Sequence, residues 1–428
     1  MSITIEDDLT NDVIIDSTKR IASIDFVKGF AIVWIILAHS ALSWFDKDWR
    51  YIYGLVFAFM DVMGPSLFVF LSALSVVFSV RRKKGKLPEK VIRNGILMRG
   101  MVIIIIGVLF NPLSLQTAGE TVPFPTNLWG WNILMFIGFS QIISYYVLKL
   151  KRNIRAILGV LIIYFSPWFR DFLYVGKSAE NVFPFFRLIL SFLHFIIVSP
   201  LPQVPILPYV AVCFICTIFG EYLYDAMVQG TSKAYYDLVK KFLIYGFILV
   251  FVGIFAFAPR GVRFDIWEAG WALQVPADTI SPGTIIKSEY LHIDLLRIAN
   301  QQDYYQFPGM PLFMIRCTAH NMFYNLGIGF LFVALCFYLI DIKKKINDVS
   351  KLVIFYGKTS LSMFLIQYLF LPLYLGQFSI IFMPILYVAY CGFLGLLMYI
   401  WLKFFDGVGT PEWIMSKVGS SGKTKKNY

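Results

Sequence analysis

The chain has 428 residues, of which 58% are hydrophobic and 15% are charged, and its mean hydropathy is +0.70. This composition excludes an ordinary soluble protein or a disordered chain and indicates a polytopic membrane protein. A net charge of +12 would suggest nucleic-acid binding in a soluble protein. Here the basic residues form short clusters between apolar segments, so we expect no nucleic-acid partner and use the clusters to predict topology.

Apolar segments long enough to cross a membrane recur along most of the chain. Residues 1–19 are acidic and lack an apolar core, so we interpret them as a cytoplasmic segment and not a cleavable signal peptide. We expect one all-α transmembrane domain over 20–405, followed by a basic cytoplasmic tail over 406–428. The sequence predicts about ten transmembrane helices, at 24–45, 53–80, 96–113, 129–148, 156–173, 203–224, 242–259, 320–341, 352–375 and 379–402.

One further apolar segment, at about 183–199, is interrupted at its end by prolines. It leads into Ser199-Pro-Leu-Pro-Gln-Val-Pro-Ile-Leu-Pro208, and each proline removes a backbone donor and disfavours a continuous helix. We therefore expect a re-entrant or interfacial segment near 183–202. If this segment spans the membrane, the helix count becomes eleven and the downstream orientation inverts.

Basic clusters follow every second predicted span. They are Arg81 to Lys84 with Lys86 and Lys90; Lys149, Lys151, Arg152 and Arg155; Lys233, Lys240 and Lys241; Lys343 to Lys345; and Lys423, Lys425 and Lys426. With ten spans all of them fall on the side of the N-terminus, so the positive-inside bias places both termini in the cytoplasm. We expect a plasma-membrane location, with the long loop 260–319 outside, covering the acceptor side of a site.

The first predicted span carries three ionisable residues, Asp25, Lys28 and His39. On a helix, Lys28 and His39 lie within roughly 20° of the same face and about 16 Å apart along the axis. Ionisable groups at such depth usually face a protein interior or a water-filled cavity. The pattern indicates a site that is reached from the membrane surface, although a lone histidine can also form a structural hydrogen bond between helices.

Metal chemistry is not indicated. Cys213 and Cys216 form a C-x-x-C pair, but on a predicted spanning helix and without a second ligand pair, so we interpret them as packing thiols. No zinc-ligand spacing is visible, and we expect no metal cofactor.

Several motifs together resemble the transmembrane acyltransferase superfamily. The closest-looking branch is the heparan-alpha-glucosaminide N-acetyltransferase-like proteins, with acyltransferase family 3 as a wider relative. The stretch from Arg20 through Lys28 to His39 resembles the first helix, in which the wider family has arginine, ten residues and a catalytic histidine. Gly64-Pro-Ser-Leu-Phe, Arg99-Gly100 and Tyr356-Gly-Lys-Thr-Ser resemble later helices, and Gln367 stands where a histidine often ends the last of these.

The resemblance implies an acyl-CoA-dependent membrane acyltransferase, most simply an acetyltransferase, acting on an amino sugar or other glycan. His39 would be the base or the transient acyl carrier, and Asp25 would orient Lys28 through an ion pair. Lys28, Arg81, Arg82 and Arg99 would bind the phosphates of cytoplasmic acetyl-CoA, although Arg81 and Arg82 also fit a topology and lipid-headgroup cluster.

The acceptor-side candidates are His320, Asn321 and Gln367, with a helix-start hydrogen bond as the alternative role for the first two. Membrane lipids are expected partners, and a homodimer is possible. The competing hypothesis is a proton-coupled transporter in which Lys28 and His39 form a relay. No inverted repeat is visible to support it.

Overall fold

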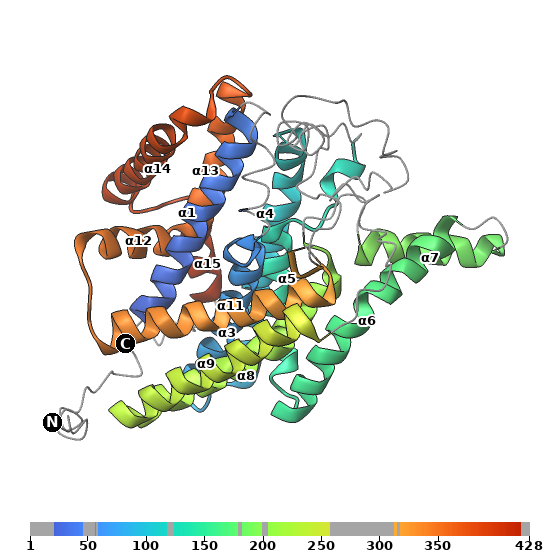
Figure 1. Cartoon of the computed structure of the whole chain (residues 1–428), viewed down its shortest axis with the longest axis horizontal. Coiled ribbons are helices and arrows are strands. Elements are labelled where there is room, and N and C mark those ends of the chain that lie inside the picture. Colours follow the sequence, from blue (N-terminus) through green and yellow to red (C-terminus); the bar gives the residue numbers. More distant parts are fainter. Residues whose placement is uncertain are drawn as a thin grey trace, which may run out of the picture.

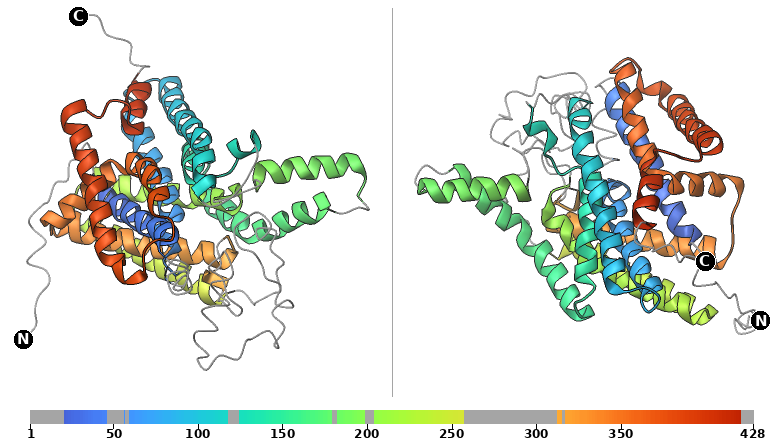
Figure 2. Two further views of the ribbon diagram at one scale, coloured as in Figure 1. Left: turned by 90° about the horizontal axis from the view of Figure 1, so that it is seen from above. Right: turned by 180° about the vertical axis from the view of Figure 1, so that it is seen from behind.

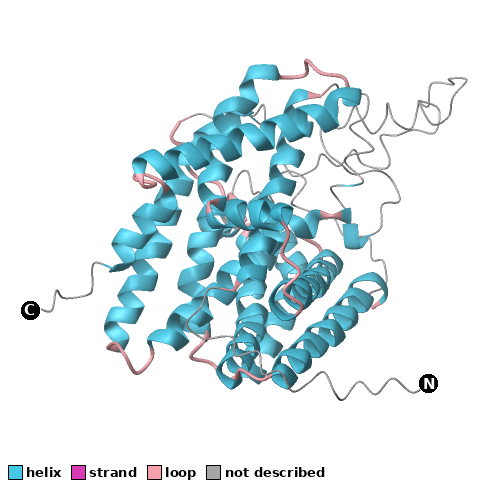
Figure 3. Ribbon diagram, turned by 90° about the vertical axis from the view of Figure 1, so that its left-hand side faces the viewer, coloured by secondary structure: helices cyan, strands magenta, loops and turns pink. Residues whose placement is uncertain are grey.

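The computed structural model describes residues 21–45, 56, 59–117, 124–178, 182–198, 204–256, 312–314 and 317–420. Within these ranges every regular element is a helix (Figures 1 and 3), as the sequence predicts. The long elements are α1 (Ala22–Trp44), α3 (Pro65–Lys83), α4 (Glu89–Thr117), α5 (Ile133–Val147), α6 (Arg152–Ser178), α7 (Pro184–Ile197), α8 (Ile206–Gln229), α9 (Ser232–Phe255), α11 (Ala319–Cys336), α12 (Asp348–Lys358), α13 (Ser360–Phe370), α14 (Met383–Phe405) and α15 (Pro411–Ser420).

Short helical turns connect these elements. They are η2 (Asp61–Met63), η3 (Thr126–Leu128), η5 (Leu312–Met314), the π-helical η6 (Phe337–Ile342), η7 (Leu371–Tyr374) and η8 (Ile380–Phe382).

The described chain contains seven helices that are long and apolar enough to cross a membrane, or eight if one bent pair counts as a span. The protein is therefore an integral membrane protein, but the predicted count of about ten is not confirmed. The expected span 53–80 corresponds to α3, whose last turn holds Arg81, Arg82 and Lys83. The expected span 129–148 corresponds to α5, which has only 15 residues.

The expected span 352–375 is not one continuous helix. It consists of α12 and α13, which meet at an angle of 84° at Thr359. The hydroxyl of Thr359 donates back to the carbonyl of Phe355, at 3.2 Å, and its side chain makes no capping hydrogen bond to the following helix. This break places α13 on a separate axis from α12, above it in Figure 1.

The segment expected near 183–202 begins as a separate short helix. Helix α7 has 14 residues, about 21 Å at 1.5 Å per residue, which is less than the roughly 30 Å hydrocarbon core. Together with the end of α6 it projects from the rest of the molecule (Figure 2). An eleventh complete span is therefore not supported, and the interfacial or re-entrant placement stays a prediction.

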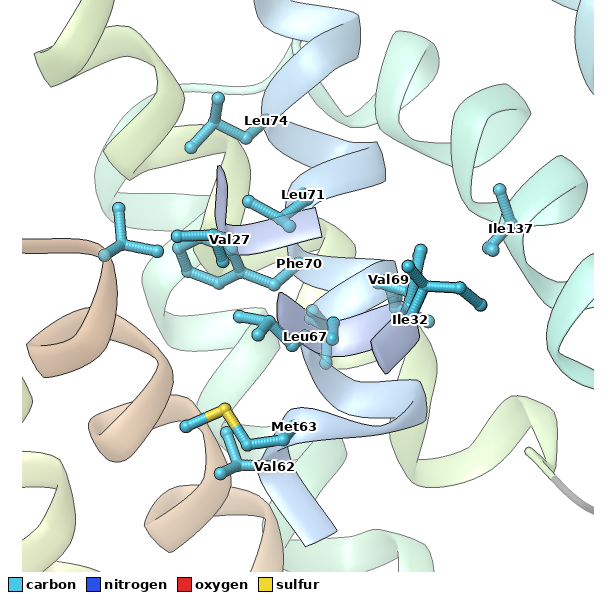
Figure 4. Packing of buried hydrophobic residues seen from close by; sticks show 14 of the residues in the cluster. Val27, Ile32, Val62, Met63, Leu67, Val69, Phe70, Leu71, Leu74 and Ile137 are labelled. Carbon is cyan, nitrogen blue, oxygen red and sulfur yellow. The ribbon is translucent and has the colours of Figure 1, made fainter. Parts of the chain in front are cut away.

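The apolar core extends through most of the helices, and one part of it lies where α1 crosses α3. Val27 and Ile32 of α1 are fully buried beside Leu67 and Leu71 of α3 (Figure 4). Helix α1 also crosses α12 at two glycines: a Cβ on Gly29 would lie 1.8 Å from the carbonyl oxygen of Val353, and one on Gly357 would lie 1.7 Å from that of Asp25. The two backbones are thus in direct contact, which only glycine permits.

Candidate active site

Helix α1 is continuous from Ala22 to Trp44, so Asp25, Lys28 and His39 lie on one helix as predicted. Asp25 is buried, with 2% of its surface exposed, whereas Lys28 and His39 are half-buried. The two ends of this helix meet different surroundings. The Asp25 end contacts η6, and the His39 end contacts α13 and η7.

The surroundings of His39 are aromatic. Its Nε2 lies 3.3 Å from the hydroxyl of Tyr368, and its ring lies 5.0 Å from the ring of Tyr368 and 6.1 Å from that of Phe364. Phe110 of α4 extends this wall, because its ring lies 4.7 Å from Tyr368 and 5.7 Å from Phe364. A histidine within hydrogen-bond distance of a tyrosine hydroxyl can accept a proton from a bound group.

Hydrogen bonds to backbone carbonyls hold α1 and α13 together around this wall. The indole of Trp44 donates to the carbonyl of Leu371 at 2.9 Å. From α14, Tyr390 donates to the carbonyl of Gln367 at 2.6 Å, and Tyr387 donates to that of Val33 at 2.7 Å. Residues remote in sequence thus fix the distance between His39 and Tyr368.

Gln367 precedes Tyr368 on α13, and its side chain is fully buried. Neither its amide oxygen nor its amide nitrogen makes a hydrogen bond in the described part of the chain. Leaving a buried polar group unpaired costs about 1–3 kcal/mol. A bound substrate group with a donor or an acceptor could satisfy the amide, which fits the prediction of Gln367 as an acceptor-side residue.

The Asp25 end contains a second carboxylate that the sequence did not single out. Asp341 of η6 accepts a hydrogen bond from the backbone N–H of Ser23 at 3.1 Å, two residues before Asp25. Its position depends on the α1–η6 contact, and no local pattern marks it. Two acidic groups therefore lie near the end of α1 that carries Lys28.

Arg81, predicted to bind cofactor, belongs to a cluster of ion pairs. Arg81, Arg152 and Arg155 all bind the buried carboxylate of Glu221; the last two pairs measure 2.8 and 2.5 Å. Arg152 also binds Asp225 at 2.7 Å. The sequence marked Arg152 and Arg155 only as topology residues, and it did not single out Glu221, because its partners come from two other helices, α3 and α6.

The other basic candidates lie on α3 and α4. Arg82 stacks over the ring of Phe78 at 5.3 Å, and Arg99 is half-buried on α4, where burial leaves its Nε without a hydrogen bond among the described residues. Between α5 and α6, outside the spans, the hydrogen bond that Lys149 donates to Glu89 raises the pKa of Lys149. Arg82 and Arg99 remain predicted cofactor ligands.

Asn321 lies in a buried polar cluster at the start of α11. Its amide donates to the carbonyl of Phe313 at 3.0 Å and its oxygen accepts from Asn325 at 3.1 Å; Asn325 in turn donates to Asp61 at 2.9 Å. The cap of this helix is Thr318, which accepts from the backbone of Asn321. His320 is half-buried in the first turn. The loop expected over 260–319 lies largely outside the described residues.

Within the described ranges, no group of three His, Cys, Asp or Glu side chains is placed so that it could hold a metal ion. The five cysteines are buried, and Cys213 and Cys216 both lie on α8, as expected for packing thiols.

Comparison with known proteins identifies the family. The model of the heparan-alpha-glucosaminide N-acetyltransferase catalytic domain matches residues 20–252, more than half of the chain. This chain belongs to that family. The match extends from the start of α1 into α9 and includes His39, but it ends before α11, α13 and α15. No curated protein matches the chain.

The family membership supports a membrane acetyltransferase and does not favour the transporter hypothesis. The matched range includes both predicted catalytic residues, Asp25 and His39. It also includes the predicted cofactor ligands Lys28, Arg81, Arg82 and Arg99. The acceptor-side candidates His320, Asn321 and Gln367 lie beyond it.

Proposed function

We propose that this protein transfers an acetyl or other short acyl group from cytoplasmic acyl-CoA to an amino-sugar or other glycan acceptor, with His39 as the reacting base or acyl carrier. The observation that carries the proposal is the contact between His39 and Tyr368 inside an aromatic wall, on the first helix of the family-matched region.

His39 serves either route through the same imidazole. As a base, it accepts the proton of the acceptor amine or hydroxyl while that group attacks the thioester carbonyl. The tetrahedral adduct then expels the CoA thiolate, which takes the proton back from the imidazolium. As a carrier, an imidazole nitrogen attacks the carbonyl, the thiol leaves, and the acceptor attacks the acyl-imidazole. The surrounding rings of Phe364, Tyr368 and Phe110 limit hydrolysis by keeping water away.

Lys28 is the proposed phosphate ligand that links the cofactor to the catalytic helix. It lies about 16 Å along the axis from His39, so a long donor bound at the cytoplasmic end could extend its thioester toward the imidazole. Asp25, one turn away, would orient the ammonium. Gln367 is the proposed hydrogen-bond partner of the acceptor or of the acyl carbonyl, because its buried amide has no partner in the described chain.

The experiment that tests the proposal is the substitution His39→Asn in purified protein supplied with labelled acetyl-CoA and amino sugars. Asparagine keeps a polar group that can hydrogen-bond but cannot take a proton near neutral pH. Turnover should fall by roughly a hundred- to ten-thousandfold. Acetyl-CoA affinity, measured by calorimetry, should stay nearly unchanged because the phosphates bind at the other end of α1.

A matched control is His194→Asn, which changes a buried histidine of α7 outside the aromatic wall. This variant should keep normal turnover. Normal acyl transfer by well-folded His39→Asn protein would contradict the proposed role of His39.

A further inference from the structure

The helix that carries the partners of His39 begins inside the fold without a cap of its own. Helix α13 starts at the 84° break after α12, and its N-cap residue, Thr359, makes no capping hydrogen bond to it. The first N–H groups of a helix have no partner within the helix. At a buried break, other groups must satisfy them.

Glu412 of α15 satisfies two of these groups from fifty residues downstream. One carboxylate oxygen accepts the backbone N–H of Leu361 at 2.9 Å and that of Ser362 at 3.2 Å. The other oxygen accepts the hydroxyl of Ser362, a residue with 2% of its surface exposed. A carboxylate at this position also interacts favourably with the positive end of the helix dipole. The C-terminal helix therefore caps α13.

The capped helix carries the aromatic wall of the site. Phe364 and Tyr368 follow Ser362 by two and six residues, or about 3 and 9 Å along the axis. At the far end of α13, Trp44 and Tyr390 bind its backbone carbonyls. Hydrogen bonds from other helices thus fix both ends of α13, and Glu412 makes the ones at the end nearer the break.

We propose that Glu412 is a positioning residue, which sets the placement of Tyr368 against His39 by fixing the start of α13. The inference rests on the proposed function of His39 and goes beyond the family comparison, which ends at residue 252. It makes the C-terminal helix a working part of the acyltransferase. Because α15 also packs on α4, which supplies Phe110, its loss would disturb two sides of the same wall.

The first test is hydrogen–deuterium exchange of the purified full-length protein. Glu412→Ala should speed the exchange of the Leu361 and Ser362 amides, which lose their acceptor, and Glu412→Gln should have a smaller effect because its amide oxygen still accepts. Thr231→Ala is the matched control, since Thr231 caps α9 through the N–H of Ala234 at 3.3 Å, away from the site. Unchanged exchange at 361–362 in Glu412→Ala protein would overturn the proposal.

The second test is a double-mutant cycle on turnover. Glu412→Ala should lower kcat by roughly ten- to a hundredfold, the scale of a small misplacement of catalytic groups, while KM for the acyl donor changes little. In a Tyr368→Phe background the same substitution should cost only about twofold more, since coupled residues do not act additively. Thr231→Ala should leave kcat unchanged.

The outcomes separate the inference from the proposed function. Suppose that His39→Asn abolishes turnover, whereas Glu412→Ala speeds the exchange of the 361–362 amides but keeps a normal kcat. That result would overturn the positioning role of Glu412 and leave the proposed function of His39 intact. Fully additive losses in the cycle would also overturn it. Normal turnover of His39→Asn would overturn the proposed function, and the positioning role with it, even if Glu412 proved to cap α13.

Discussion

Lys28 and His39 lie on the same helix but face different kinds of neighbours. Asp25 lies one turn from Lys28 and Asp341 binds the start of the same helix at Ser23, whereas near His39 the fold places the rings of Phe364 and Tyr368. In the proposed function Lys28 itself binds the anionic phosphates, Asp25 orients its ammonium, and the apolar rings surround the reacting imidazole. The proposed function therefore assigns cofactor binding and acyl transfer to opposite ends of one helix.

This separation predicts different effects at the two residues. Lys28→Ala should weaken acetyl-CoA binding by about 1.5–3 kcal/mol, the worth of a hydrogen bond to a charged group. Lys28→Arg should retain or improve the affinity, because guanidinium can bind a phosphate through two parallel hydrogen bonds. Isothermal calorimetry with acetyl-CoA measures both. Equal affinities in the wild-type protein and both variants would mean that Lys28 does not bind the cofactor.

At the scale of elements, the crossing of α1 and α12 fixes the start of the catalytic helix. Gly29 and Gly357 each bring their own backbone against the partner helix, and Gly357 faces the carbonyl of Asp25. No side chain fits in either contact. The placement of Asp25 and Lys28 therefore depends on two glycines that are more than three hundred residues apart in sequence.

We predict that Gly357→Ala separates α1 from α12. The new methyl group would lie 1.7 Å from the carbonyl oxygen of Asp25, so the helices must move apart. Overpacking of this kind costs typically 1–3 kcal/mol or more, and thermal unfolding of the purified protein should show the loss. Gly392→Ala on α14 is the control, because a Cβ there meets no atom within 4 Å. A melting temperature equal to that of the control would contradict the close crossing.

The sequence predicted those helices whose limits are set by neighbouring residues in the chain. The length and polarity of α1 and the short α7 before its prolines could be predicted from consecutive residues. The break at Thr359 could not, because no proline marks it and its stabilising carboxylate, Glu412, lies fifty residues away. Residues 406–428 were predicted only as a basic tail, yet they include the helix α15.

In the candidate site, too, contacts between residues remote in sequence could not be predicted. His39 was predicted from its depth in an apolar segment, and Gln367 from a motif, but Tyr368 and Phe110 could not be chosen among the many aromatic residues. Their role depends on which helices meet at α1. Arg81 was predicted as a cofactor ligand from charge alone, and the buried Glu221 that binds it was missed because buried pairing is a property of the assembled helices.

At the scale of the whole molecule, the proposed topology sets the direction of the reaction across the membrane. The basic clusters predict that the turn between α3 and α4 lies in the cytoplasm. The turn before α14 should then lie outside, at the end of α1 where Phe45 pairs with Phe378. Cytoplasmic donor and outer acceptor would thus reach the site from opposite ends of α1.

Single cysteines test this topology. Lys86→Cys and Ser379→Cys place exposed thiols in the two turns, and the native cysteines should contribute little labelling because all five are buried. An impermeant maleimide should label Ser379→Cys in right-side-out vesicles and Lys86→Cys only in inverted ones. The reverse pattern would place the termini outside, and labelling of both variants from one side would rule out the predicted pairing of spans.

The cap on α13 also orders events during biosynthesis. Glu412 follows Ser362 by fifty residues, which at about 5–20 residues per second means that the ribosome adds it roughly 3–10 seconds later. During that interval the nascent chain already holds every residue of the family-matched region, but α13 lacks its carboxylate. A premature stop codon between Tyr374 and Glu412 would therefore yield a protein that contains both His39 and α13 but lacks the carboxylate that caps α13.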